Sequence, residues 1–215
     1  MGLTITSGIL ADFIDNEPEG YQAYKVIFDN INTILKANHI TPHLEPDVLD
    51  TKPLYSGGFP YAFLHILRRF AAHVWENKDQ DNDNWVPSPF LIDDAPGEDP
   101  ILETHYSYMS SHLLTHSDSE GFYIPVKLPE VLFDTDASPV PGAMLGSSYN
   151  LLSELKSLTK HLGIILNEED IISNLPEINQ EIQDEGDFWV EKLMCATLLD
   201  AAKFSITNNT AIVFS

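Results

Sequence analysis

The chain has 215 residues, one cysteine, and 33 acidic against 11 basic side chains, which give a formal charge of −22. One cysteine excludes an internal disulfide and any multi-cysteine metal site, so we expect a reducing, cytoplasmic setting. A hydrophobic content of 43% is sufficient for a folded core. The length favours a single domain over residues 1–215. No apolar stretch is long enough to span a bilayer, and we expect no membrane association.

Apolar residues recur at helical spacing in two segments of the first part of the chain. One stripe runs over residues 21–37 and the other from Phe59 to Val74, and both segments are predicted to be helices. We expect the outer face of the second helix to carry Arg68 and Arg69. The prolines and glycines between the two helices predict an extended connection.

The middle of the chain combines acidic residues with prolines. Residues 79–100 hold four prolines and seven acidic residues without any hydrophobic period, so they are predicted to form a long acidic loop. A third helix is expected from about Ile101 to His116. Residues 121–142 are predicted to be a proline-rich connection, extended or resembling an edge strand, because proline cannot donate a hydrogen bond within a central strand.

The last third of the chain is mostly helical in pattern. Ser147 or Ser148 can cap a helix whose leucines repeat every three to four residues as far as Leu162. Two shorter helices over residues 167–173 and 176–184 and a long apolar helix over 187–204 are expected to follow, with one short strand over 210–214. These patterns predict a mainly α fold, a single-domain helical fold with long loops and at most a few short strands.

Four side chains near the end of the third predicted helix form a candidate metal site. In a continuous helix His105, His112 and His116 would lie on one narrow face. Asp118 and Glu120 follow directly, so His112 and His116 with a carboxylate from Asp118 or Glu120 could bind a divalent metal. We expect at least one of the two imidazoles to be accessible to solvent. The alternative is that these are ordinary hydrogen-bonded histidines at the edge of the core.

No motif of a known catalytic class is present. The sequence lacks a serine nucleophile elbow, a Walker loop and a dinucleotide-binding glycine pattern. The runs over residues 116–125 and 145–152 resemble segments of uncharacterised bacterial proteins with no assigned activity. The resemblance implies a bacterial cytoplasmic protein and supplies no catalytic residues.

The charge is concentrated in two blocks, residues 79–120 and 164–204. A charge of −22 repels phosphate backbones, so nucleic acid is excluded as a ligand. The same field attracts basic proteins. We therefore expect a non-enzymatic acidic binding protein without a cofactor, for example an immunity- or inhibitor-like protein that contacts a basic partner. The alternative is a metal-binding protein or metal-dependent enzyme that uses the His/carboxylate site.

Overall fold

The computed structural model describes residues 2–79, 87–89 and 95–215, and these residues form a mixed α/β fold. The described chain contains a six-stranded sheet with the strand order β2-β1-β6-β3-β5-β4. Strands β3 and β5 are parallel, and every other neighbouring pair is antiparallel. The strands are β1 (Leu3–Ser7), β2 (Leu54–Phe59), β3 (Gly121–Ile124), β4 (Leu132–Phe133), β5 (Met144–Ser147) and β6 (Ile212–Phe214). The prediction of a mainly helical fold was therefore wrong.

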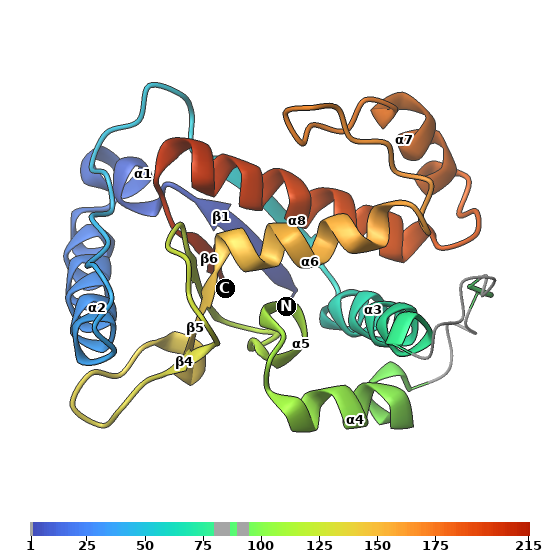
Figure 1. Cartoon of the computed structure of the whole chain (residues 1–215). Coiled ribbons are helices and arrows are strands. Elements are labelled where there is room, and N and C mark those ends of the chain that lie inside the picture. The colour runs from blue at the N-terminus through green and yellow to red at the C-terminus, as the bar shows by residue number, and fades with distance from the viewer. Residues whose placement is uncertain (1, 80–86, 90–94) are drawn as a thin grey trace.

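Helices cover both faces of this sheet (Figure 1). They are α1 (Ile9–Asn16), α2 (Pro18–Ala37), α3 (Tyr61–Asp79), α4 (Pro100–Tyr108), α5 (His112–Thr115), α6 (Ser148–Thr159), α7 (Leu175–Gln183) and α8 (Trp189–Asn208), with 3-10 turns η1 (Pro96–Glu98) and η2 (Pro141–Ala143). Helices α1 and α2 pack on one face, whereas α3, α6 and α8 pack on the other. Among the described residues, no helix is both long and apolar enough to cross a membrane.

Alternation along the strands divides the apolar side chains between two cores. In β6, Ile212 and Phe214 join the core under α3, α6 and α8, whereas Val213 points to the core under α1 and α2. Strand β3 alternates in the same way, because successive residues of a strand face opposite sides. The sheet therefore has no solvent-exposed face at its centre, and strands β3 and β6 are buried on both sides.

Several predicted helices are confirmed, and their ends have local causes. Helix α6 begins after Ser147, whose side-chain oxygen accepts a hydrogen bond from the backbone N–H of Asn150. Helix α2 has Pro18 in its first turn, where a proline is tolerated. Helix α8 is central, as expected, with Met194 and Cys195 fully buried. The predicted strand near the end of the chain is confirmed as β6.

Three regions differ from the sequence prediction. Gly121–Ile124 form the inner strand β3 and not an edge, because the first proline, Pro125, comes directly after the strand. Residues 167–173 form a turn closed by the bridge between Leu166 and Ile172, not a helix. In the predicted acidic loop, α3 extends to Asp79 and residues 80–86 and 90–94 lie outside the described residues. A single domain over residues 1–215 stays a prediction.

Candidate interaction surface

The third predicted helix is broken, so the histidines do not share a face. Helix α4 ends at Tyr108, where Met109 adopts a left-handed conformation with φ of 48°. A new single turn, α5, begins at His112, and Ser111 caps it by accepting from the backbone N–H of Leu114. The break redirects the chain between His105 and His112, and each imidazole meets different neighbours.

Both histidines of the predicted metal site are buried. His112 is 0% exposed and His116 is 2% exposed, so the expectation of an accessible imidazole was wrong. Nδ1 of His112 accepts from the backbone N–H of Ser147, and the ring nitrogens of His116 each lie 3.0 Å from a carbonyl, of Ser117 and of Phe122. Burial lowers the pKa of each imidazole to about 4. Both rings are parts of the core, and burial favours their neutral form.

The two carboxylates of the predicted site point elsewhere. Oδ2 of Asp118 lies 2.6 Å from Nε2 of His65 on α3, and Glu120 is exposed on the surface. Within the described chain, no group of three or more His, Cys, Asp or Glu side chains is placed to hold a metal ion. Metal binding through His112, His116, Asp118 and Glu120 stays a prediction, and this geometry adds no support to it.

We call residues 111–120 the histidine junction, and Arg68 forms hydrogen bonds to its backbone. It is 2% exposed, and its guanidinium donates to the carbonyls of Leu113, His116 and Ser117. Arg69 is 3% exposed. The expectation that both arginines face solvent was wrong. Arg68 packs under the junction, whose backbone carbonyls take the place of water as acceptors. Arg69 lies beside the residues at the start of α8.

The carboxyl group of Glu154 also forms hydrogen bonds to the histidine junction. Glu154 of α6 accepts hydrogen bonds from Ser111 Oγ and from the backbone N–H groups of His112 and Leu113. These are the unpaired donors at the start of a helical turn, which a carboxylate satisfies well. Burial raises the pKa of Glu154, while the three hydrogen bonds lower it in part. Neither Glu154 nor Arg68 carried a motif that sequence reasoning could have found.

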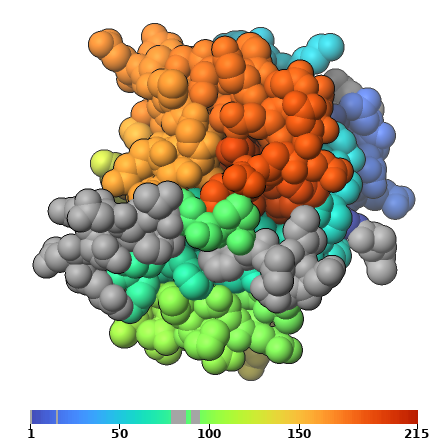
Figure 2. Space-filling view, turned by 90° about the vertical axis from the view of Figure 1, so that its right-hand side faces the viewer, coloured from blue at the N-terminus to red at the C-terminus, as the bar shows by residue number. Residues whose placement is uncertain are grey.

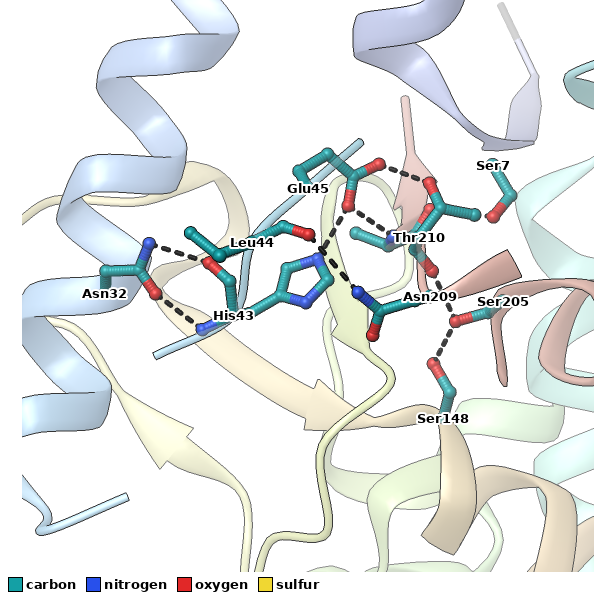
Figure 3. Close-up of polar contacts among 10 residues, drawn as sticks. Ser7, Asn32, His43, Leu44, Glu45, Ser148, Ser205, Asn209 and Thr210 are labelled. Carbon is teal, nitrogen blue, oxygen red and sulfur yellow. Dashed lines mark hydrogen bonds and ion pairs between the residues drawn. The ribbon is translucent and has the colours of Figure 1, made fainter. Parts of the chain in front are cut away.

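A second buried polar cluster ties residues 43–45 to the end of α8 and the start of β6 (Figure 3). Nε2 of His43 lies 2.7 Å from Oε2 of Glu45, and Glu45 also accepts from the hydroxyl of Thr210 and the backbone N–H of Ala211. Ser205 extends the cluster by donating to the carbonyl of Thr210. The side chains of His43 and Glu45 are both 1% exposed. We call this cluster the Glu45 clamp, and its satisfied hydrogen bonds indicate a structural role.

The exposed charge gathers on what we call the acidic lobe, residues 164–187. It contains eight acidic residues and no Lys or Arg: Glu168, Glu169, Asp170, Glu177, Glu181, Asp184, Glu185 and Asp187. Figure 1 shows the lobe (orange) at the end of the molecule opposite α2, and Figure 2 views the molecule onto that end, where the lobe forms the upper surface.

Local hydrogen bonds hold the lobe in shape. The side-chain oxygen of Asn167 accepts from the backbone N–H groups of Glu169 and Ile171, which fixes the turn that carries the first acids. Helix α7 buries Ile178 against the core and turns Glu177 and Glu181 outward. These two carboxylates are four residues apart, which separates them by about 6 Å along the helix axis.

Few cations offset the charge of the lobe. Among the described residues, only Asp170 and Glu181 of the eight acids form ion pairs, with Lys156 and Lys192. Lys192 is itself buried, as are both arginines of the chain. Six of the eight acids of the lobe therefore have no ion-pair partner among the described residues.

The fold and this surface define a class of protein: an acidic α/β protein that presents a cluster of exposed carboxylates on the lobe. The chain belongs to the family described as "Putative DNA-mimic protein", whose sequence model matches residues 1–214. Comparison with curated proteins and with solved structures gave no match. Membership agrees with the expectation of an acidic interaction protein. A bacterial origin and a cytoplasmic location stay predictions.

Proposed function

We propose that the protein is a non-enzymatic, inhibitor-like mimic of DNA, which binds the DNA-contacting surface of a basic DNA-binding protein in the cytoplasm. The observation that carries the proposal is the family match over residues 1–214 together with the uncompensated carboxylates of the acidic lobe. A surface that holds DNA is built from Lys and Arg side chains that contact phosphates. The same Lys and Arg side chains also donate hydrogen bonds to carboxylates.

The rigidity of the lobe supports this role. The packed helix and the hydrogen-bonded turn that carry these carboxylates have an ordered backbone before binding, so only the side chains lose conformational entropy when a partner docks. Charge of one sign also speeds encounter with a basic surface, and added salt slows it. Binding to the partner should therefore weaken steeply with salt, as DNA binding does.

A capture and competition experiment tests the proposal. The full-length protein is immobilised and exposed to a nuclease-treated extract of the source cells at low and at high salt. We expect basic DNA-binding proteins to be retained at low salt only, and duplex DNA to displace them. Retention of no basic protein at either salt would contradict the proposal. So would a retained protein that binds duplex DNA and this protein at the same time.

A charge-neutralised variant locates the surface. The triple variant Glu168→Gln, Glu169→Gln and Glu177→Gln removes three exposed charges from the lobe. We expect it to lose about tenfold or more in affinity for the retained partner, because rim charges that steer association act together. The matched control, Glu17→Gln, Glu19→Gln and Asp29→Asn, removes three exposed charges around α2 at the opposite end and should keep most of the affinity.

A further inference from the structure

An open groove lies between the acidic lobe and α8, with the turn at residues 165–173 and α7 on the side of the lobe. Its volume is about 290 Å³ and its walls include Ile171, Leu175, Ile182 and Leu193. This is below the range of about 300 to 1,000 Å³ that encloses a drug-sized molecule, but it is ample for a large apolar side chain. The groove therefore fits one or two side chains of a protein partner.

Apolar side chains at the rim are left open to solvent. Ile171 is 48% exposed and Leu175 is 44% exposed, although both line the groove. The floor is a stripe of α8 that includes Leu193, Thr197 and Asp200, residues four and then three apart and so on one side of the helix. An exposed apolar hollow inside a charged surface is the pattern of a protein-binding site and has no use in mimicking phosphates.

The charge around the groove indicates what kind of molecule binds there. Asp170, Asp200 and Lys203 line the groove, and Asp170 is paired with Lys156. The exposed acids Glu168, Glu169 and Glu177 on the adjoining turn and helix leave the surroundings of the groove acidic. A second copy of this chain would bring the same acidic lobe and a formal charge of −22 against it, which opposes association. A basic partner complements the charge of this rim. Burial raises the pKa of Asp200, so a Lys or Arg of the partner beside it would stabilise the ionised form of that carboxyl group.

We propose that the groove binds an apolar side chain of the size of leucine or phenylalanine, flanked by Lys or Arg, from the basic protein that the acidic lobe binds. The inference rests on the proposed function and adds a source of specificity to it. The two carboxylates of helix α7 are about 6 Å apart along its axis, whereas each DNA strand carries one charge about every 3.4 Å. A mimic with sparser charge competes with DNA by using a contact that DNA does not offer, and a buried apolar anchor is such a contact.

Two labelled peptides test this inference with the full-length protein. Both are short and rich in Lys and Arg, and they differ only at two central positions, Leu-Phe in one and Ser-Ser in the other. Fluorescence anisotropy gives the affinity of each. We expect the Leu-Phe peptide to bind about tenfold more tightly or better, the ratio expected from burying one large apolar side chain.

Two variants separate the groove from the charges. Thr197→Trp fills the groove and should reduce the affinity ratio of the two peptides to about one, while leaving binding of the Ser-Ser peptide unchanged. Ile171→Ser changes an exposed rim residue and should lower the affinity of the Leu-Phe peptide severalfold even if the tryptophan variant folds poorly. Thermal unfolding of both variants monitors the fold.

The outcomes distinguish this inference from the proposed function. If both peptides bind with equal affinity and salt weakens both, the inference about the groove is overturned. The proposed DNA-mimic function is not affected by this result. Binding of neither peptide at low salt would count against both. A concentration-dependent dimer in sedimentation that Thr197→Trp dissociates would assign the groove to a second copy and overturn the inference.

Discussion

The histidine junction and the acidic lobe both hold charged side chains, and the two regions use them in opposite ways. At the junction, Arg68 and Glu154 are withdrawn from water and each satisfies two or three backbone groups. On the lobe, Glu168 and Glu177 face solvent. Buried charges are stabilising only in combination with their partners, whereas exposed charges contribute little to folding and remain available to another molecule.

The difference shows that residue type alone does not identify a functional site. The junction has the composition of a metal site, with two histidines and two acids within nine residues, yet its histidines are core residues. The lobe has a common composition of Glu, Asp and Asn, and the evidence for its role is exposure, rigidity and the scarcity of cations. Comparing the free energy of unfolding of variants from the two regions tests this distinction directly.

The largest loss of stability is expected from Arg68→Met. The substitution keeps an unbranched apolar stem and leaves the carbonyls of Leu113, His116 and Ser117 without their donor. We expect the free energy of unfolding to fall by about 3 to 5 kcal/mol, measured by urea denaturation. Lys36→Met, on the exposed face of α2, is the control and should change it by less than about 0.5 kcal/mol. A loss below about 1 kcal/mol for Arg68→Met would show that water replaces the guanidinium.

The next largest effect is expected at the Glu45 clamp. In Glu45→Gln an amide replaces a carboxyl group that accepts from Thr210 and Ala211 and contacts His43. The amide NH₂ group faces donors, so about 2 kcal/mol of stability should be lost. Hydrogen exchange at Ala211 and Ile212 should accelerate in the variant. Unchanged exchange there would mean that β6 is held without the clamp.

Acid should weaken the junction through its histidines. The pKa of His112 and of His116 is lowered to about 4 in the folded state from 6.5, so the unfolded chain takes up these protons first. Stability is therefore full above about pH 6.5 and falls as the pH drops toward 4, by about 1.4 kcal/mol per pH unit for each histidine. From pH 6.5 to pH 5 the loss is about 2 kcal/mol per histidine by the same relation.

A histidine variant isolates this effect from the carboxyl groups. Burial raises the pKa of Glu154, which acts in the opposite direction as the pH falls. His112→Gln is expected to be less stable at pH 7 but to lose less stability between pH 7 and pH 5 than the unchanged protein. Urea denaturation at both pH values measures the two slopes. Parallel slopes would show that His112 takes up the same number of protons in the folded and in the unfolded state over this range.

The smallest effect on stability is expected from the acidic lobe. The triple variant Glu168→Gln, Glu169→Gln and Glu177→Gln should change the free energy of unfolding by less than about 0.5 kcal/mol. Any change should be a gain at low salt, because like charges repel, and should disappear at high salt. A loss above about 1 kcal/mol would show that these carboxylates stabilise the fold. The acidic lobe and the histidine junction would then not differ in how their charges contribute to stability.

Local patterns predicted the helices well and the sheet poorly. The leucine repeat of α6 and the apolar stripe of α2 depend on neighbours three and four residues away, which the sequence displays directly. Strand β1 has five residues and strand β3 has four, too few for an alternating pattern to stand out. Their pairing partners are distant in sequence, and no local signal specifies such a pairing.

The candidate site failed for a related reason. The spacing of His105, His112 and His116 indicates one face only if the helix is continuous, and the left-handed turn at Met109 is not encoded by a glycine or proline. Arg68 was expected to face outward because charged residues of helices usually do. Its actual acceptors are carbonyls 45 and more positions further along the chain. The acidic charge of residues 164–204 was visible from the sequence, but the groove that α7 and α8 enclose was not.

The position of β6 sets the order in which the molecule can fold during synthesis. The strand lies between β1 and β3, and Ser7 donates to the carbonyl of Ala211 across a separation of 204 positions. The ribosome must therefore release residues 212–214 before the sheet can close, and until then β1 and β3 expose unpaired edges. Contacts of such long range slow folding and leave a window for aggregation. A nascent chain stalled before residue 212 should remain sensitive to protease across β1 and β3, even though α2 and α6 can already be helical.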